Sequence, residues 1–156
     1  MAMEKTAIVL LLDEAIRLEN NVSDLYKKFF HHHDDYEFWW KLAMEEKNHA
    51  SLLRAGKEYY LDCFPREILP EALTELKAAN RQVEEYLNSA VIPDRATRFK
   101  IALELEDAAG EIHYQRAMEA ETGGPMLVLF QKLNNEDKDH AARIRAYRRE
   151  NDLELP

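Results

Sequence analysis

A carboxylate and a histidine spaced for metal binding occur twice in this chain. Glu46 and His49 are three residues apart, and Asp137 and His140 repeat that spacing. Residues three apart leave an α-helix on the same side, so each pair would aim an acid and an imidazole at one point. Carboxylate and imidazole groups together bind divalent transition metals. Each pair is therefore a candidate half of a metal site, although one such pair alone is weak evidence.

Both pairs lie within apolar stripes that the sequence predicts for the inner faces of helices. Trp39, Leu42 and Leu53 flank the first pair at alternating spacings of three and four residues, and Leu133 and Ile144 flank the second. This spacing is typical of helices that pack in a bundle. A carboxylate buried there without a partner would cost several kcal/mol, so a compensating charge is expected beside it.

Two further predicted helices carry one acid each, Glu19 and Glu106, in the middle of the apolar stripe. The two halves of the chain match around these acids: residues 18–20 correspond to 105–107, and residues 41–50 correspond to 132–141. Two halves related by a local dyad would bring six groups together: Glu19, Glu46, His49, Glu106, Asp137 and His140. Their four carboxylates carry four negative charges, which two divalent cations would neutralise.

Composition and hydrophobic spacing predict an all-α protein with one domain, residues 1–156. Only 4 Gly and 5 Pro occur, and strong helix formers are abundant. We expect helices at about 4–30, 35–60, 71–89, 94–121 and 125–149. The 71–89 stretch has no acid in its apolar stripe, so it should pack without taking part in the site. A connection of about thirty residues around it lets the helices on either side run parallel, as in ferritin-like bundles.

Local signals predict where several helices begin and end. Asp34 followed three residues later by Glu37 resembles a capping box, and Pro93 with Asp94 marks a second helix start. Pro125 marks a third start, while residues 63–65 and 122–124 should end the helices before them. Residues 31–33, all histidine, are read as a polar turn, because adjacent residues do not converge on one helical face.

Charge and cysteine usage exclude several classes of function. The formal net charge of −9 argues against a nucleic-acid or anionic-membrane partner. The apolar run at 7–12 is too short to span a bilayer, and no signal peptide is evident. The single cysteine, Cys63, permits no internal disulfide, so a reducing, cytoplasmic location is the simplest expectation. The one basic cluster fits a solvated helix end: Arg143, Arg145, Arg148 and Arg149.

The six acids and histidines, their order and the long central connection resemble the rubrerythrin branch of the ferritin-like di-iron carboxylate superfamily. The resemblance covers residues 5–147, nearly the whole chain. It implies a ferritin-like four-helix bundle with an extra crossover helix between helices 2 and 3. It also implies two iron ions (Fe²⁺/Fe³⁺) at the six groups, with Glu46 and Asp137 as bridges. Ligand type alone would also admit manganese or zinc.

Three departures from that family pattern bear on the chemistry. Asp137 stands where the family usually has Glu, and the shorter side chain leaves its role as a ligand open. Ala109 replaces the extra Glu that rubrerythrins use to shuttle an iron, which argues against their kind of peroxidase chemistry. Together with Gly110 it leaves room beside the metals for dioxygen or peroxide, unless a large neighbour fills that space. The rubredoxin module is absent, so electrons would come from a separate rubredoxin-like protein or flavoprotein.

Four other residues near the predicted ligands each have two interpretations. Tyr26 is either a catalytic one-electron relay that donates a hydrogen bond to a ligand carboxylate, or a core tyrosine. His113, at the matching place in the other half, is a core or outer histidine rather than a seventh ligand. Glu45 and Glu136 either orient the opposite imidazole or are solvated flanking residues.

Three functions fit these features. The leading one is a non-haem di-iron oxidoreductase that reduces peroxide or dioxygen with electrons from an external donor. The second is ferroxidase or iron-handling activity of the ferritin type, and its storage form requires a shell of many subunits. The third is a non-catalytic bundle that holds zinc or no metal and serves protein interaction. A homodimer could form through exposed aromatic residues such as Trp40 or Tyr59.

Overall fold

The computed structural model describes residues 2–31, 34–61, 70–119 and 125–153. These residues form five α-helices: α1 (Ala2–Phe30), α2 (Tyr36–Tyr60), α3 (Pro70–Asn88), α4 (Arg95–Glu119) and α5 (Pro125–Glu150). The prediction of an all-α protein is therefore confirmed, and the described helix ends lie close to the expected ones. None of the described helices is both long enough and apolar enough to cross a membrane.

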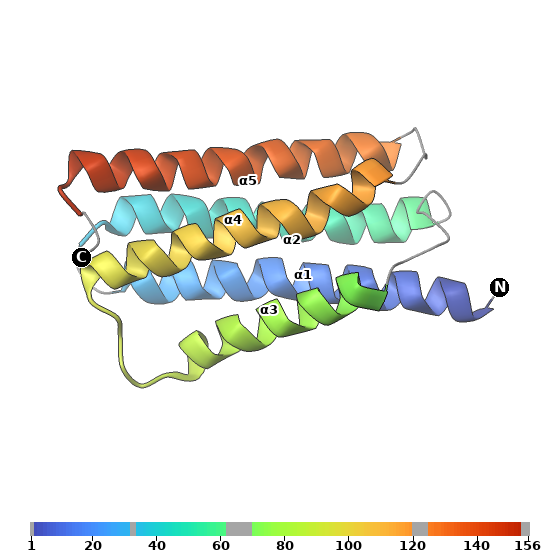
Figure 1. The fold of residues 1–156 in the computed structure, drawn as a ribbon, viewed down its shortest axis with the longest axis horizontal. Coiled ribbons are helices and arrows are strands. Elements are labelled where there is room, and N and C mark those ends of the chain that lie inside the picture. Colours follow the sequence, from blue (N-terminus) through green and yellow to red (C-terminus); the bar gives the residue numbers. More distant parts are fainter. Residues whose placement is uncertain (1, 32–33, 62–69, 120–124, 154–156) are drawn as a thin grey trace.

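The four longer helices lie side by side, and α3 crosses beside α1 on the way from α2 to α4 (Figure 1). The most extensive contacts join α1 to α2, α4 to α5 and α1 to α3. Figure 1 shows α2 and α4 running in the same direction, opposite to α1, α3 and α5. The α3 connection is what permits this direction, because a short turn would reverse the chain.

An aromatic cluster fills the core at the end of the bundle where α2 begins. Trp39 and Phe99 are fully buried, with ring centroids 4.5 Å apart, and the Tyr26 ring lies 5.6 Å from that of Trp39. Phe29 packs edge-on against Trp39 at 5.0 Å. These large rings join α1, α2 and α4 into one core, which holds the backbones of those helices at fixed separations.

Polar contacts attach α3 to α1. Asn80 is buried on α3, and its amide donates to the backbone carbonyl and the carboxylate of Glu14. Asn80 also accepts a hydrogen bond from Asn21. At the end of α3, the Lys28 ammonium donates to the carbonyls of Tyr86, Leu87 and Ser89. Those carbonyls have no partner within the helix, so Lys28 satisfies its C-terminus.

The expected capping box at Asp34 and Glu37 is wrong. The residue that precedes α2 is Asp35, whose backbone is left-handed (φ 65°) and whose side chain makes no capping hydrogen bond. Its carboxylate instead accepts from Arg95, at 2.8 Å from Nε, and from Tyr147 at 2.7 Å. A charge-assisted contact to α4 and α5 thus replaces the local cap.

The other predicted helix starts are confirmed where the structure describes them. Asp94 Oδ1 accepts a hydrogen bond from the Thr97 backbone at the start of α4, and α5 begins at Pro125. The predicted stops at 63–65 and 122–124, and two residues of the histidine run, 32–33, lie outside the described residues. Of the aromatic residues considered for a subunit contact, Trp40 is 48% exposed and Tyr59 71% exposed.

Candidate metal centre

All six predicted ligands lie in the interior of the bundle. Each has at most 4% of its surface exposed: Glu19, Glu46, His49, Glu106, Asp137 and His140. They come from four helices, one acid each from α1 and α4, and an acid with its histidine each from α2 and α5. Helical spacing aims each acid-x-x-His pair inward, and the packing of the four helices brings the pairs and the single acids together.

The six residues form two overlapping groups. In one group, which we call the His49 subsite, Glu19, Glu46 and His49 offer ligand atoms that lie within 4.8 Å of one another. In the other, the His140 subsite, Glu46, Glu106, Asp137 and His140 do the same. Glu46 belongs to both groups. The arrangement is suited to two adjacent cations that share the Glu46 carboxylate.

The inner nitrogen of each imidazole faces the carboxylates. His140 Nδ1 lies 2.7 Å from Glu46 Oε1 and 3.3 Å from a Glu106 oxygen. His49 Nδ1 lies 3.2 Å from Glu46 Oε2 and 3.5 Å from Asp137 Oδ1. Both Nδ1 atoms and Glu46 Oε1 are buried, and none of them makes a hydrogen bond of good geometry within the described part of the chain. Buried polar atoms without partners are rare, and cations at the two subsites would satisfy all three.

The outer nitrogen of each imidazole contacts an acid on the opposite helix. His49 Nε2 is 2.6 Å from a Glu136 oxygen, and His140 Nε2 is 2.8 Å from Glu45 Oε2. Of the two interpretations of Glu45 and Glu136, the structure thus favours orientation of the imidazole. Because a carboxylate can only accept, Nε2 carries a proton in both rings, so Nδ1 is the nitrogen whose lone pair a metal could bind once it loses its proton.

Without cations, bound protons supply the positive charge that the buried carboxylates of this centre need. Burial raises the pKa of the Glu46 carboxyl well above its usual value, and the charges of Glu106 and Glu19 raise it further. Burial lowers the pKa of His49, but the close carboxylates of Glu19 and Glu46 outweigh burial and raise it to about 11. At His140, too, the nearby carboxylates outweigh burial and raise the pKa well above its usual value. The carboxylates thus need positive charge beside them, which protons or cations can supply.

Tyr26 reaches one of the candidate ligands from across the bundle. Its hydroxyl donates a 2.6 Å hydrogen bond to Glu106 Oε1, and both side chains are buried. Burial, together with the negative charges of Glu106 and Glu46, raises the pKa of the Tyr26 phenol well above its usual value. Tyr26 therefore keeps its proton and fixes one oxygen of Glu106, which leaves the other oxygen directed at His140.

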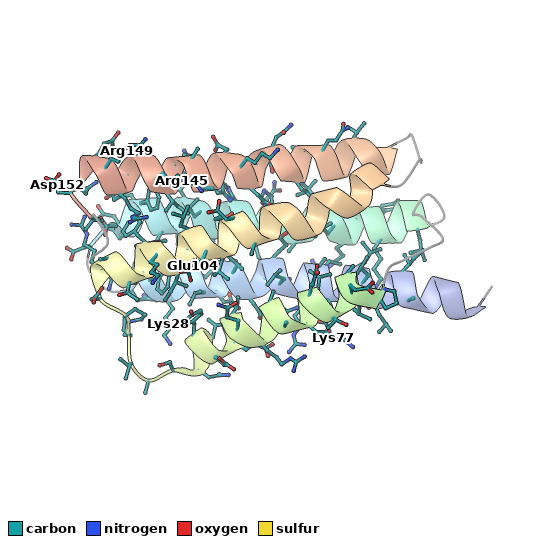
Figure 2. All side chains as sticks on the ribbon, viewed as in Figure 1. Lys28, Lys77, Glu104, Arg145, Arg149 and Asp152 are labelled. Atoms are coloured by element: carbon teal, nitrogen blue, oxygen red, sulfur yellow. The ribbon has the colours of Figure 1, made fainter. Side chains whose placement is uncertain are left out.

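Sequence reasoning missed Arg143. The sequence pattern predicts a solvated basic cluster that includes Arg143, and Figure 2 shows Arg145 and Arg149 toward the end of α5, where that description fits. Arg143 instead donates a 2.6 Å hydrogen bond to Glu45 Oε2, the same oxygen that His140 contacts. Its position one turn after His140 was the available signal, since residues three apart share a helical face.

A small cavity of about 80 Å³ is lined by residues of α1, α3 and α4, and none of the six candidate ligands lines it. Leu18 and Leu105, the residues before Glu19 and Glu106, line it. The rest of the lining is mainly small or apolar: Val22, Ala79, Gln82, Glu104 and Ala108. The side chains of Ala109, Gly110 and His113 lie outside the described residues, so the expected room beside the metals and the role of His113 stay predictions.

Comparison of the chain with protein-family models, with curated protein sequences and with solved structures finds no significant match. The features that point to a function are therefore the two overlapping groups of buried carboxylates and imidazoles.

Proposed function

We propose that this protein binds two divalent metal ions at the His49 and His140 subsites, and that the ions are iron. The observation that carries the proposal is the convergence of six buried ligands, in which Glu46 is shared and both imidazoles direct Nδ1 inward at carboxylates, without a hydrogen bond of good geometry to any described residue. We further propose that the four long helices are a ferritin-like bundle with α3 as its crossover helix, which is the arrangement the rubrerythrin resemblance implies.

The charge of the centre supports two divalent ions. Four carboxylates and two neutral imidazoles carry a formal charge of −4, which two divalent cations cancel. A single ion would leave two negative charges uncompensated in the interior. A mixed set of carboxylate and imidazole ligands suits iron or manganese, and would also accept zinc.

For the reaction, we propose reduction of a small oxidant, peroxide or dioxygen, by the reduced centre. Iron would supply the one-electron chemistry that the protein side chains cannot perform alone. Electrons would come from an external donor, a rubredoxin-like protein or a flavoprotein.

In this proposal Tyr26 holds a proton next to the centre. Its hydroxyl donates to Glu106 Oε1, so the phenol could give one electron to the oxidised centre while its proton moves along the hydrogen bond to that oxygen, and an electron from the external donor would then restore the phenol as the proton returns. Trp39 lies behind Tyr26, with ring centroids 5.6 Å apart, and forms part of the dry core that keeps water from the phenol. Tyr26 is thus the residue that we assign to one-electron relay.

Metal analysis and an oxidant reaction test the proposal in two steps. Anaerobic addition of Fe²⁺ to metal-free protein should give two bound ions per chain by elemental analysis after desalting. Mixing that protein with peroxide or with air should then produce ferric absorbance in the near ultraviolet. Binding of fewer than two ions would refute the dinuclear centre. Two bound ions without any spectral change would refute the redox role and favour a zinc or non-catalytic site.

The ferritin-type alternative differs in its assembly. Iron storage requires a hollow shell of many subunits, whereas the proposed oxidoreductase works as a monomer or a homodimer. Light scattering of the iron-loaded protein separates these cases, since a particle of one or two chains has no interior for stored iron. A large, closed assembly that takes up many ions per chain would support storage instead.

A further inference from the structure

We infer that Glu45 and Glu136 are positioning residues that each orient the imidazole of the opposite helix, and that Arg143 makes the His140 subsite the tighter of the two. This inference rests on the proposed function, because it concerns the same two metal subsites. It adds an order of metal binding, and it assigns roles to three residues outside the ligand set.

The positioning contacts cross between α2 and α5. Glu45 precedes Glu46 on α2, yet it contacts His140 on α5 at 2.8 Å. Glu136, on α5, contacts His49 on α2 at 2.6 Å. Each outer acid therefore acts on the subsite whose histidine lies on the other helix. The two contacts also tie α2 to α5 across the centre, a pair of helices that share few other contacts.

The two positioning acids are held unequally. The Arg143 guanidinium donates to Glu45 Oε2 at 2.6 Å and is itself held by Asp139 at 3.2 Å, so Glu45 lies between Arg143 and His140. Apart from His49, the described residue that pairs with Glu136 is Lys132, at 3.8 Å, and the Lys132 side chain is 56% exposed. Such an exposed pair contributes little to order, whereas a short Arg–carboxylate contact restricts the acid strongly.

The number of ligands in each subsite also favours tighter binding at the His140 subsite. Among the described residues the His140 subsite offers three carboxylates and one imidazole, while the His49 subsite offers two carboxylates and one imidazole. More negative charge and a better oriented imidazole both raise the affinity for a divalent cation. The first equivalent of metal should therefore occupy the His140 subsite, and the second should occupy the His49 subsite.

Zinc serves as the probe, because it binds the same ligand types and has no redox chemistry. We would titrate metal-free wild-type protein and variants with Zn²⁺ in competition with a chromogenic chelator. Glu45→Gln and Glu136→Gln keep the shape of the side chain and remove its charge. Each should weaken one of two binding steps by about 10- to 100-fold, the effect usual for residues that orient metal ligands. Glu58→Gln, an exposed change on α2, is the matched control and should alter neither step.

An anomalous-scattering map of crystals soaked with one equivalent of Zn²⁺ assigns each step to a subsite. In the wild type the stronger peak should lie beside His140, and in Glu45→Gln the peak should move to His49. Arg143→Met removes the charge that holds Glu45, so it should reduce the preference for the His140 subsite even if Glu45→Gln fails to fold. Circular dichroism of each metal-free variant separates a loss of metal binding from a loss of structure.

Two results would overturn the inference alone: a wild-type protein that binds two ions but fills the His49 subsite first, or Glu45→Gln and Glu136→Gln variants that bind both ions as the wild type does. A wild-type protein that binds no Zn²⁺ and no Fe²⁺ would overturn the proposed function, and this inference with it. The same titration thus distinguishes failure of this inference from failure of the proposed function.

Discussion

Replacing Glu46 by Gln should abolish the stability that metal ions give to this protein, because the two subsites share the Glu46 carboxylate. Gln has nearly the same shape, so the change removes a charge and one bridging oxygen without opening a cavity. In metal-free protein the substitution should be neutral or stabilising, because burial and the charges of Glu106 and Glu19 raise the pKa of the Glu46 carboxyl and already favour its uncharged form, which Gln resembles. The expected effects of this substitution on the metal-bound and metal-free proteins thus differ in sign.

The magnitude follows from linkage between binding and folding. A ligand present at a thousand times its dissociation constant stabilises the folded state by about 4.1 kcal/mol per site. For a domain of this size, 1 kcal/mol shifts the melting temperature by about 2–4 °C. Each occupied subsite should therefore raise the melting temperature by about 8–16 °C. Loss of both subsites in Glu46→Gln removes the whole shift, whereas Glu19→Gln removes only the contribution of the His49 subsite.

The assay is thermal unfolding followed by circular dichroism, with and without Zn²⁺ and again after chelation. Wild-type protein should melt well above its chelated form, and Glu46→Gln should melt at one temperature under all conditions. Glu58→Gln, which is exposed on the same helix, should behave as the wild type. The reasoning is refuted if Glu46→Gln keeps the metal-induced shift, or if metal-free Glu46→Gln is markedly less stable than metal-free wild type.

Three further predictions concern single contacts. Asp35→Asn tolerates the left-handed backbone but loses the charge facing Arg95, so urea unfolding at pH 7 should show a loss of about 1.5–3 kcal/mol. Burial alone would raise the pKa of Asp35, but its hydrogen-bond partners Arg95 and Tyr147 hold that pKa below its usual value. The stability that Asp35 contributes is therefore present above about pH 4 and should disappear as pH falls through the lowered pKa. A stability difference between wild type and Asp35→Asn that is as large at pH 2 as at pH 7 would contradict this. Tyr26→Phe removes the hydrogen bond to Glu106 and should slow peroxide-driven iron oxidation in stopped flow while two ions still bind; an unchanged rate would exclude the relay role. Asn80→Ala should destabilise the fold by about 1–3 kcal/mol in urea, because it leaves buried partners on α1 unsatisfied, and a neutral result would show that water replaces the amide.

Residue spacing alone determined which stretches form helices and that the candidate ligands point inward from them. An α-helix turns 100° per residue, so Glu46 and His49 must leave α2 on one side, and apolar neighbours on that side show that it is the inner one. Proline and the Asp94 cap marked where α4 and α5 begin, because their effects are local to one turn. Information of this kind needs no knowledge of the other helices.

The tertiary structure decided which groups meet. Sequence could not show whether Glu45 and Glu136 face solvent or the opposite imidazole, because that depends on how far α2 and α5 are rotated and shifted against each other. The same rotation brings Arg143 to Glu45 and places Glu46, but not Asp137, in both ligand groups. The Asp35 carboxylate binds Arg95 rather than capping its own helix for a related reason: a charged partner on α4 stabilises it more than a nearby backbone N–H. Helical periodicity fixes the direction of a side chain within its helix, whereas packing between helices sets its partners.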